Sequence, residues 1–349
     1  MNRRFTVLSV GYALAPVGPD AVGGAEQVLS ALDRALVAAG HCSIVVAPEG
    51  SLVAGRLIAT AKLPARITDH ERGAIERRQR QVIEQALSEQ RIDLIHAHGL
   101  DFAEHLPETA VPTLITLHLP AEFYRPEALA ARPNTWFHCV SADQQRRFPP
   151  LPTMLDPIPN GVPIDCLWAR HARRGFALAL GRICPEKGFH LGLDAARLAR
   201  TPLLLAGQVF PYETHQRYFS EEIRPRLGRH ARFLGPIGFA RKRRLLAAAR
   251  ALLIPSLVPE TSSLVAMEAL ACGCPVVAFP AGALPDLVEP GLTGFLVSTV
   301  DEMAAAIPRC DGLDRERCRE LARQRFSLDS MIESYFRLYR RFGPAEARL

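Results

Sequence analysis

The stretch that decides the fold is RALLIPSLVPETSSLVAMEALACGCPVVAFPAGALPDLVEPGLTGFLV, residues 250–297. Its apolar run 251–254 ends at a proline and predicts a buried strand. A loop with Glu260 leads into a predicted helix over 264–271, and residues 276–279 predict a second short strand. A strand, a helix and another strand in this order form the unit that builds a parallel sheet.

The start of this helix suits a negatively charged ligand. In parallel sheets, ligands bind outside the carboxyl ends of the strands, where Glu260 and the helix start would lie. Thr261, Ser262 and Ser263 offer hydroxyl groups that can cap the helix. Free backbone N–H groups at a helix start favour an anion, above all a phosphate, so we expect a phosphate group here.

A second carboxylate, Glu268, lies inside the predicted helix. Glutamates in helices are mostly solvated, but here the residues on both sides, 264–267 and 269–271, are all apolar. A helix that is apolar all round is buried, and a buried carboxylate needs a partner or a ligand. We therefore predict that Glu268 is buried and bound.

The two glutamates and the residues around them resemble a known site. The spacing E-TSSLVAM-E, followed by ALACGCPVVAFPAGALPDLVEPGLTGFLV, resembles the nucleotide-sugar site of family 4 glycosyltransferases, which have the GT-B fold. The resemblance implies that Glu260 faces the transferred sugar and that Glu268 binds the ribose hydroxyls of the donor. It also implies that Ser262, Ser263 and Leu264 bind the donor.

Length and resemblance together predict two domains. A chain of 349 residues suits two domains, each with its own core. The resemblance implies two Rossmann-like, doubly wound α/β domains that face each other across a cleft. The segment PNGVP at 159–163 resembles the turn that ends the first domain in this family. We place an acceptor-side domain at 1–165, a nucleotide-sugar domain at 166–325 and a helix that crosses back to the first domain at 326–349.

The net charge of +6 is unevenly distributed. Residues 1–165 hold 15 Lys and Arg against 18 Asp and Glu, whereas residues 166–349 hold 27 against 18. The basic half carries the glutamate motif, as expected for a domain that binds a dianionic diphosphate. A generally basic surface or an anionic membrane partner is the alternative. We expect no nucleic-acid partner, because the sequence has no helix-turn-helix, finger or aromatic-basic platform motif.

The eight cysteines predict reduced thiols in a cytoplasmic protein. They are scattered and form no CxxC pair, which is not the pattern of a disulfide framework or a zinc site. The start MNRRFTVLSVGYAL runs directly into a predicted strand and has no cleavage-like segment. Charged residues and prolines interrupt the longest apolar stretches, so we expect no membrane span. A peripheral position on the inner face of the membrane is the alternative to a freely soluble protein.

The N-terminal region predicts a strand over 5–10, a loop with Gly23 and Gly24, and a helix over 25–39. Glycines between a strand and a helix can let a phosphate approach the backbone, or can be simple turn residues. The stretch GGAEQVLSALDRALVAAGH, residues 23–41, resembles the first loop and helix of the same glycosyltransferases. This resemblance favours a donor-binding role for both glycines.

A basic helix is predicted over 69–91. Its patch of arginines consists of Arg72, Arg77, Arg78 and Arg80. These arginines either lie on a solvated surface helix or attach the protein to an anionic membrane, as in relatives of the resembled family that use lipid acceptors.

Three histidines lie at or near the carboxyl ends of two predicted strands, 94–97 and 113–117. They would face one crevice of the first domain. The resemblance implies that His118 lies beside the reacting sugar. His98 matches a less specific position of the family, and we assign His96 a structural role.

Two cations lie in the loop GRICPEKG, residues 181–188, which follows a predicted strand. Arg182 and Lys187 could simply be solvated. However, the chain has 39 Arg and only three Lys, and GR followed five residues later by K resembles the family's diphosphate clamp. In that clamp both cations neutralise the leaving group. Gly207, at the end of the predicted strand 203–206, is expected to approach the same crevice.

Two further helical regions are predicted in the second half of the chain. The helix over 239–250 packs Leu245 and Leu246 inward, and residues 241–244, which include Lys242, are expected to be solvated. Residues 300–342 are expected to be helical.

These patterns together predict a glycosyltransferase that moves a sugar from a nucleotide diphosphate to an acceptor held by the first domain. Departure of a nucleotide diphosphate needs positive charge, which Arg182, Lys187 and a helix dipole supply. With Glu260 and His118, which position the sugar, they form the expected catalytic set. The resemblance implies retention of configuration and no metal, and the sequence has no DxD-like carboxylate pair to hold Mg²⁺. No cofactor is expected beyond the nucleotide sugar.

The donor and the acceptor are less strongly indicated. The stretches APVGPDAVGGAEQ and VVAPEGS resemble a bacterial subgroup that transfers glucose to pteridines and antibiotic-type small molecules, so UDP-glucose is the expected donor. The acceptor is left open as a small molecule, a glycan or a lipid. One alternative is a GT-B epimerase or hydrolase that needs no acceptor. Another is a non-catalytic interaction protein, against which the intact set of motif residues argues.

Overall fold

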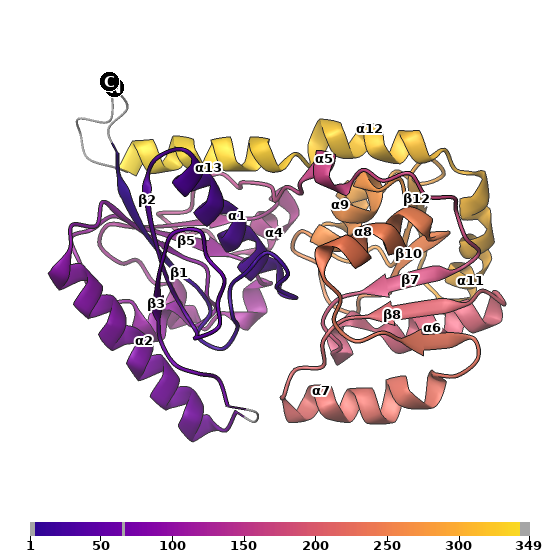
Figure 1. Ribbon diagram of the computed structural model, residues 1–349, viewed down its shortest axis with the longest axis horizontal. Helices are drawn as coiled ribbons and strands as arrows, with labels where there is room; N and C mark the ends of the chain where they lie inside the picture. The colour runs from indigo at the N-terminus through magenta and orange to yellow at the C-terminus, as the bar shows by residue number, and fades with distance from the viewer. Residues whose placement is uncertain (1–3, 65–66, 343–349) are drawn as a thin grey trace. The chain divides into compact units, whose positions relative to one another are not determined.

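The structure, a computed structural model, describes residues 4–64 and 67–342. It divides into two compact units, which we call the first domain (residues 4–159 and 331–342) and the second domain (residues 160–330). Each domain is built on one six-stranded sheet with helices packed against it (Figure 1). The predicted α/β class with two Rossmann-like domains is therefore confirmed.

The sheet of the first domain has the strand order β3-β2-β1-β4-β5-β6, and all neighbouring strands are parallel. Apolar runs form its inner strands because helices cover a parallel sheet on both faces. Leu8 and Ile95, which are paired on neighbouring strands, are both buried. The strands are β1 (Thr6–Val10), β2 (Cys42–Ala47), β3 (Arg56–Ala59), β4 (Leu94–Ala97), β5 (Thr113–Leu117) and β6 (Thr135–Cys139).

Helices from both ends of the chain belong to the first domain. They are α1 (Gly24–Ala38), α2 (Asp69–Glu89), α3 (Phe102–His105), α4 (Ala142–Arg147) and, from residue 331 on, α13 (Leu328–Phe342). Helix α2 begins with a capping box, in which the Thr68 hydroxyl accepts from the Glu71 N–H and the Glu71 carboxylate accepts from the Thr68 N–H. The predicted basic helix is thus confirmed. Of its arginines, Arg72 is half-buried and Arg77, Arg78 and Arg80 are exposed.

The sheet of the second domain has the order β12-β11-β10-β7-β8-β9, again with parallel neighbours. The strand order reverses between β7 and β10, and ligands of doubly wound sheets bind at such a reversal. The strands are β7 (Ala177–Leu180), β8 (Leu203–Ala206), β9 (Ala231–Phe233), β10 (Ala251–Ile254), β11 (Val276–Ala278) and β12 (Gly294–Leu296). The helices are α5 (Ile164–Leu167), α6 (Phe189–Leu198), α7 (Glu213–Tyr218), α8 (Phe239–Ala248), α9 (Leu264–Ala271), α10 (Leu284–Leu287), α11 (Val300–Arg309) and α12 (Arg315–Arg325).

The stretch 250–297 folds as predicted. Strand β10 leads into α9 and then into β11, and the predicted bounds of β10 and α9 are confirmed. Helix α9 is buried, with Ala266, Ala269 and Leu270 inaccessible to solvent. Because α9 is enclosed, Glu268 is only 3% exposed.

Two strands escaped prediction, β3 and β12. Both lie at the edge of a sheet and pair on one side only, but so do β6 and β9, so edge position alone does not explain why they were missed. Strand β3 is partly exposed, and β12 is three residues long and begins with a glycine. The expected helical region 300–342 is divided into α11, α12 and α13.

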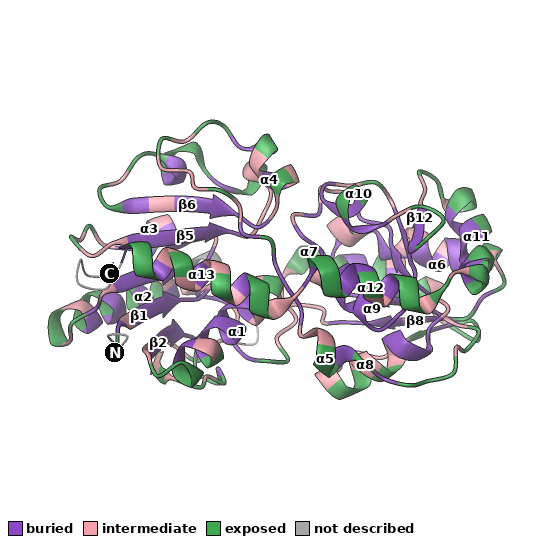
Figure 2. Cartoon of the chain, turned by 90° about the horizontal axis from the view of Figure 1, so that it is seen from above, coloured by how far each residue is buried: buried purple, intermediate pink, exposed green. Residues whose placement is uncertain are grey.

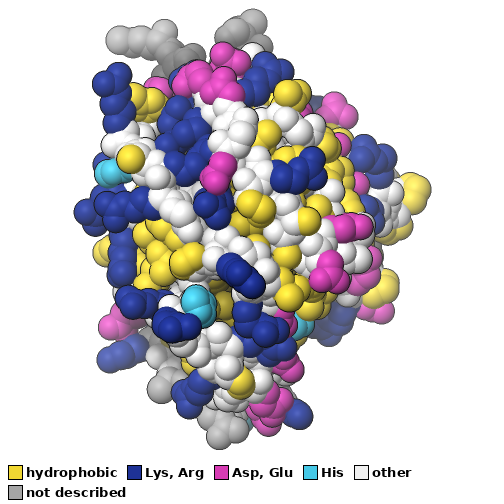
Figure 3. Space-filling model, turned by 90° about the vertical axis from the view of Figure 1, so that its right-hand side faces the viewer, with side chains coloured by type: hydrophobic (Ala, Val, Ile, Leu, Met, Phe, Trp, Pro, Cys, Tyr) yellow, Lys and Arg dark blue, Asp and Glu magenta, His cyan; other side chains and the backbone are white. Residues whose placement is uncertain are grey.

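The distribution of side chains over the surface is mixed. The strands are the most buried parts of both domains, whereas the outward faces of α12 and α13 are exposed (Figure 2). Lys and Arg side chains are spread over the face drawn in Figure 3, among acidic and hydrophobic groups. All eight cysteines lie in the described residues and are free, and six of them are buried. No helix among the described residues is long and apolar enough to cross a bilayer.

Candidate functional site

An ion pair lies where the strand order of the second domain reverses. The Nζ atom of Lys187 donates to Oε1 of Glu260 at 2.6 Å, and the Ser256 hydroxyl donates to the same oxygen. Lys187 belongs to the turn η3 (Pro185–Lys187) after β7, and Glu260 lies in the loop after β10. The structure thus brings together two of the four expected catalytic residues.

Backbone contacts hold these two loops together. The Leu257 N–H donates to the Glu186 carbonyl at 2.8 Å. Gly188 has a φ of 59°, and a side-chain carbon there would lie 2.2 Å from the carbonyl oxygen of Pro255. Only glycine allows this turn so close to another backbone segment. Gly188 therefore holds the backbone of the Lys187 turn in place.

The carboxylate of Glu260 is held in its ionised form. Burial alone would raise the pKa of Glu260, but the Lys187 ammonium, the Ser256 hydroxyl and the Arg182 guanidinium lower it more. The pKa of Glu260 therefore lies below its ordinary value. Arg182, a third expected catalytic residue, follows β7 and is half-buried in the same loop as Lys187.

The start of α9 has no side-chain cap. Ser263 is the N-cap residue, but it adopts a left-handed conformation with a φ of 52° and its hydroxyl makes no capping hydrogen bond. The expected hydroxyl cap is therefore wrong. The hydroxyl oxygens of Ser262 and Ser263 are buried and have no hydrogen-bond partner among the described residues. An uncapped helix start leaves backbone N–H groups available to an anion, and left-handed residues with side chains cluster at ligand sites.

A second ion pair lies inside the same domain. Lys242 on α8 donates through Nζ to Oε1 of Glu268 at 2.5 Å. The other carboxylate oxygen, Oε2, is buried and has no partner in the described part of the chain. The prediction that Glu268 is buried and bound is confirmed. The expectation that Lys242 is solvated is wrong, because its side chain is only 15% exposed.

Close packing explains why two of the expected donor-binding positions are occupied by glycine. Gly207 has a φ of 153°, and a side-chain carbon there would lie 1.8 Å from the carbonyl oxygen of Gly181. At Gly23 such a carbon would lie 1.8 Å from a carboxylate oxygen of Glu26, which folds back over the first turn of α1. This carboxylate occupies the helix start that would otherwise favour an anion. Donor contacts by Gly207, Gly23 and its neighbour Gly24 stay predictions.

Histidines of the first domain form a hydrogen-bonded chain with α13. Burial lowers the pKa of His138 to about 4, and its Nδ1 donates to the carbonyl of Cys139 at 3.1 Å. Its Nε2 therefore accepts from Thr116, which in turn accepts from Nε2 of His96, both at 2.7 Å. Nδ1 of His96 then accepts from the Tyr339 hydroxyl at 2.7 Å. Both ring nitrogens of His96 are thus bonded, which agrees with its structural assignment.

His98 and His118 lie beside this chain, after β4 and β5. Nδ1 of His98 lies 3.0 Å from Nε2 of His118. Burial lowers the pKa of both, that of His118 to about 3 with His138 adding to the shift, so one neutral ring donates to the other. Nε2 of His98 is buried and lacks a partner within the described residues. The functional roles expected of His118 and His98 stay predictions.

Sequence reasoning missed Ser256 and Lys242. Ser256 lies in the motif stretch, but nothing in a lone serine indicates a bond to a glutamate four residues later. Lys242 had a signal, because it is one of three lysines in a chain with 39 arginines. Lys242 was overlooked because it lies in the basic run 241–244, which is typical of a solvated helix face.

Both halves of the chain match models of glycosyltransferase domains. Residues 22–165 match Glycosyltransferase Family 4, and residues 175–310 match Glycosyl transferases group 1. The D-inositol 3-phosphate glycosyltransferase of Mycobacterium bovis is 32% identical over 215 residues, which is 54% of this chain and 44% of that protein. The phosphatidyl-myo-inositol mannosyltransferase of Mycobacterium leprae is 32% identical over 164 residues, 43% of this chain and 41% of that protein. The chain therefore spans less than half the length of the curated relatives it matches.

Solved structures share the fold over almost the whole chain. Sucrose-phosphate synthase from Thermosynechococcus elongatus has a TM-score of 0.79 at 20% identity and covers 97% of this chain and 99% of its own. HepE of Anabaena, in complex with UDP-glucose, has a TM-score of 0.74 at 21% identity and covers 96% and 99%. With the two family models, these likenesses show that the chain carries the two domains of a GT-B glycosyltransferase.

Proposed function

We propose that this protein is a retaining glycosyltransferase that moves a hexose from a nucleotide diphosphate to an acceptor, without a metal ion in the chemical step. The Lys187–Glu260 pair, at the reversal of the strand order, carries the proposal. A cation and a carboxylate at this point suit a donor whose diphosphate is negative and whose sugar presents hydroxyl groups. The resemblance of the surrounding motif supports retention of configuration.

Positive charge beside the departing phosphate is the main chemical requirement. Arg182 and Lys187 supply it, together with the uncapped N–H groups of α9 and the hydroxyls of Ser262 and Ser263. The Lys187 ammonium has three N–H donors, so it can bind the diphosphate while it keeps its bond to Glu260. Backbone N–H groups and two fixed cations replace the charge of a metal ion.

The ribose of the donor is assigned to Glu268. Its Oε2 is buried without a partner in the described residues, and a ribose hydroxyl would satisfy it. Oε1 stays bonded to Lys242, which holds the carboxylate in place. Lys242 is thus a positioning residue in this proposal. Leu264, the first residue of α9, contributes its backbone at the same helix start.

UDP-glucose is the proposed donor, and His118 is proposed to contact the transferred glucose. The solved complex of HepE with UDP-glucose supports the choice of nucleotide and sugar. The names of the curated relatives support an inositol-containing acceptor, either a soluble phosphate or a lipid. His98 supports His118 through the hydrogen bond between their rings.

Product analysis tests this function. A thermal-shift screen of nucleotide sugars is followed by incubation of the stabilising donor with inositol phosphates and with phosphatidylinositol, and by mass spectrometry of the products. We expect one acceptor to gain the mass of a hexose, with the α-anomer retained from the donor and no loss after exhaustive EDTA treatment. A free or epimerised sugar without acceptor would contradict transfer, and activity that Mg²⁺ or Mn²⁺ restores after EDTA would contradict metal independence.

We also propose that the protein works in the cytoplasm, with α2 in peripheral contact with an anionic membrane. Arg77, Arg78 and Arg80 are exposed on this helix, and each arginine near an anionic surface contributes roughly 1 kcal/mol of binding. Arg72 is a minor contributor, since it donates to the Tyr12 hydroxyl at 3.4 Å. Co-sedimentation with phosphatidylserine vesicles should fall when the three exposed arginines are changed to Gln. If changing Arg241 and Arg244 to Gln lowered co-sedimentation equally, membrane binding would not be specific to α2.

A further inference from the structure

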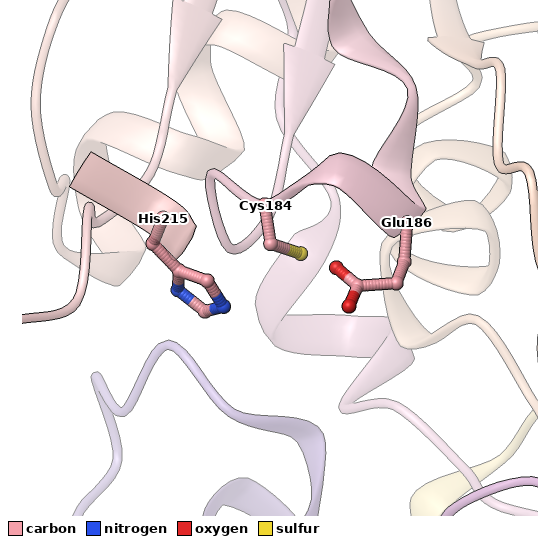
Figure 4. Close-up of side chains that lie close together, drawn as sticks. All are labelled: Cys184, Glu186 and His215. Carbon is pink, nitrogen blue, oxygen red and sulfur yellow. The ribbon is translucent and has the colours of Figure 1, made fainter. Parts of the chain in front are cut away.

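Three side chains with metal-binding atoms converge beside the Lys187 turn. Cys184 lies in the loop after β7, Glu186 in η3 and His215 in α7 (Figure 4). One ligand atom from each, the sulfur, a carboxylate oxygen and a ring nitrogen, lies within 4.8 Å of the other two. In Figure 4 the Cys184 thiol lies between the imidazole and the carboxylate. None of the three residues is needed for the proposed sugar transfer.

The cluster is buried and its polar groups are incompletely bonded. Cys184 is 1% exposed and His215 is 8% exposed. Oε2 of Glu186 and Nδ1 of His215 are both buried, and neither has a hydrogen-bond partner within the described residues. Most buried polar atoms in proteins are bonded, so the unbonded Glu186 oxygen indicates a missing ligand. Nε2 of His215 is the ring nitrogen on the side of Cys184 and Glu186 (Figure 4), and it is the atom that would bind this ligand.

We propose that Cys184, Glu186 and His215 bind a zinc ion. A thiolate, an imidazole and a carboxylate are ligands that Zn²⁺ accepts together, whereas Mg²⁺ and Ca²⁺ prefer oxygen ligands alone. Three protein ligands leave the fourth tetrahedral position to water. Bond lengths of about 2.0–2.3 Å place tetrahedral ligands about 3.3–3.6 Å apart, a spacing that atoms within 4.8 Å of one another reach by small side-chain rotations.

The charges of the site suit a divalent cation. Burial raises the pKa of the Cys184 thiol to about 11, so Zn²⁺ displaces its proton to solvent when it binds. Burial lowers the pKa of His215, which leaves a neutral ring for the metal. A thiolate and the Glu186 carboxylate then balance the two charges of the ion. A neutral centre is compatible with the neighbouring cations Arg182 and Lys187.

The ion would join two separate parts of the second domain. Cys184 and Glu186 flank Pro185 in the loop that carries Lys187, and His215 comes from α7. A bound zinc ion therefore ties the loop after β7 to a helix, while the Gly188 turn and the backbone bond between Leu257 and Glu186 already hold Lys187 in place without it. The ion acts on the loop, and it takes no part in the bond that the proposed transferase breaks.

Cobalt titration of the whole protein tests the site. Co²⁺ substitutes for Zn²⁺, and tetrahedral coordination with a thiolate gives visible d–d bands and a sulfur-to-cobalt charge-transfer band. Exposed Cys166 is first changed to Ser, so that adventitious binding at its thiol gives no signal. We expect one Co²⁺ per chain with both sets of bands, and displacement of the cobalt by one equivalent of Zn²⁺.

Three variants in the Cys166→Ser background assign the ligands. Cys184→Ser should abolish the charge-transfer band, and His215→Ala and Glu186→Gln should weaken Zn²⁺ binding by more than about 100-fold, which exceeds the effect of losing a residue that only supports a ligand. Cys272→Ser, which removes another buried thiol, should leave the spectrum unchanged. Circular dichroism confirms folding, and Cys184→Ala replaces Cys184→Ser if the latter does not fold. Absence of thiolate bands in the parent, or bands that survive Cys184→Ser, would overturn the proposal.

Discussion

The Nζ atom of Lys242 lies 2.5 Å from Oε1 of Glu268, and this ion pair joins α8 to the buried helix α9. The two side chains are 15% and 4% exposed, so water compensates neither charge well. Glu268 is therefore stable in the protein interior without a nucleotide. Glu268 therefore has two roles, an ion pair that stabilises its burial and the proposed binding of a ligand. These roles must be tested with different variants.

Removal of Lys242 should destabilise the second domain. Lys242→Ala leaves the buried Glu268 carboxylate without a counter-ion, and we expect the free energy of unfolding to fall by about 3 kcal/mol. Urea denaturation measures the loss, with Lys62→Ala, which removes an exposed lysine, as the matched control. Lys242→Met combined with Glu268→Leu should recover most of the stability, since it removes both charges. Equal stability of Lys242→Ala and the parent would show that the pair is not formed.

Lys187 should matter for turnover. Lys187→Ala removes one of the two cations beside the departing phosphate. The transition state should lose about 2–4 kcal/mol of stabilisation, and this loss should appear as a lower kcat. Some loss of stability is also expected, because Glu260 keeps Ser256 but loses its counter-ion. Steady-state kinetics are therefore referred to the folded fraction from circular dichroism. An unchanged kcat in folded protein would remove Lys187 from the mechanism, and Lys62→Ala should have no effect.

Glu268 should bind the ribose, and a double-mutant cycle can show it. Charge-assisted hydrogen bonds contribute about 1.5–3 kcal/mol each, so Glu268→Gln should weaken donor binding roughly ten-fold or more. A 2′,3′-dideoxy nucleotide should bind the parent protein poorly, and its affinity should fall much less when Glu268 is changed to Gln. Titration calorimetry of both proteins with both nucleotides completes the cycle. If the two losses simply add, Glu268 contributes only to structure.

The first domain should unfold in mild acid. Burial lowers the pKa of His96, His98, His118 and His138 in the folded state, while the same residues titrate near 6.5 when unfolded. The unfolded chain therefore takes up protons first as the pH falls below about 6.5, and stability is lost between that value and the folded pKa values near 3–4. Each histidine contributes about 1.4 kcal/mol per pH unit in this window.

Denaturation at several pH values measures this dependence. His138→Gln should lower the slope of stability against pH by about one proton, whereas His70→Gln, at an exposed position of α2, should leave it unchanged. A parent protein whose stability is constant from pH 7 to pH 5 would contradict the neutral histidine chain.

Apolar runs made much of the fold predictable. Inner strands such as β4, β5, β8 and β10 are covered on both faces, so burial leaves a continuous signal in their sequences. Edge strands are less constrained, and two of the four, β3 and β12, were missed, because β3 is partly exposed and β12 is short and begins with a glycine. The burial of Glu268 could be predicted because it is the one polar residue of an otherwise apolar helix.

Partners brought together by packing were not predictable. Lys242 and Glu268 are 26 residues apart on different helices, and no local pattern relates them. The same holds for Cys184 and His215, which the CxxC criterion overlooks because their ligand atoms meet only after α7 packs beside the loop. The missing cap of α9 depends on the left-handed conformation of Ser263, which the run TSS does not indicate.

The bond between Tyr339 and His96 also has a consequence for the synthesis of the protein. The two residues are 243 positions apart, and the first domain contains chain from both sides of the second domain. All residues of the second domain are synthesised before Tyr339, so its chain is complete before that of the first domain. The first domain waits with its histidine chain incomplete until the last helix is released. The first domain is therefore begun before the second domain and completed after it.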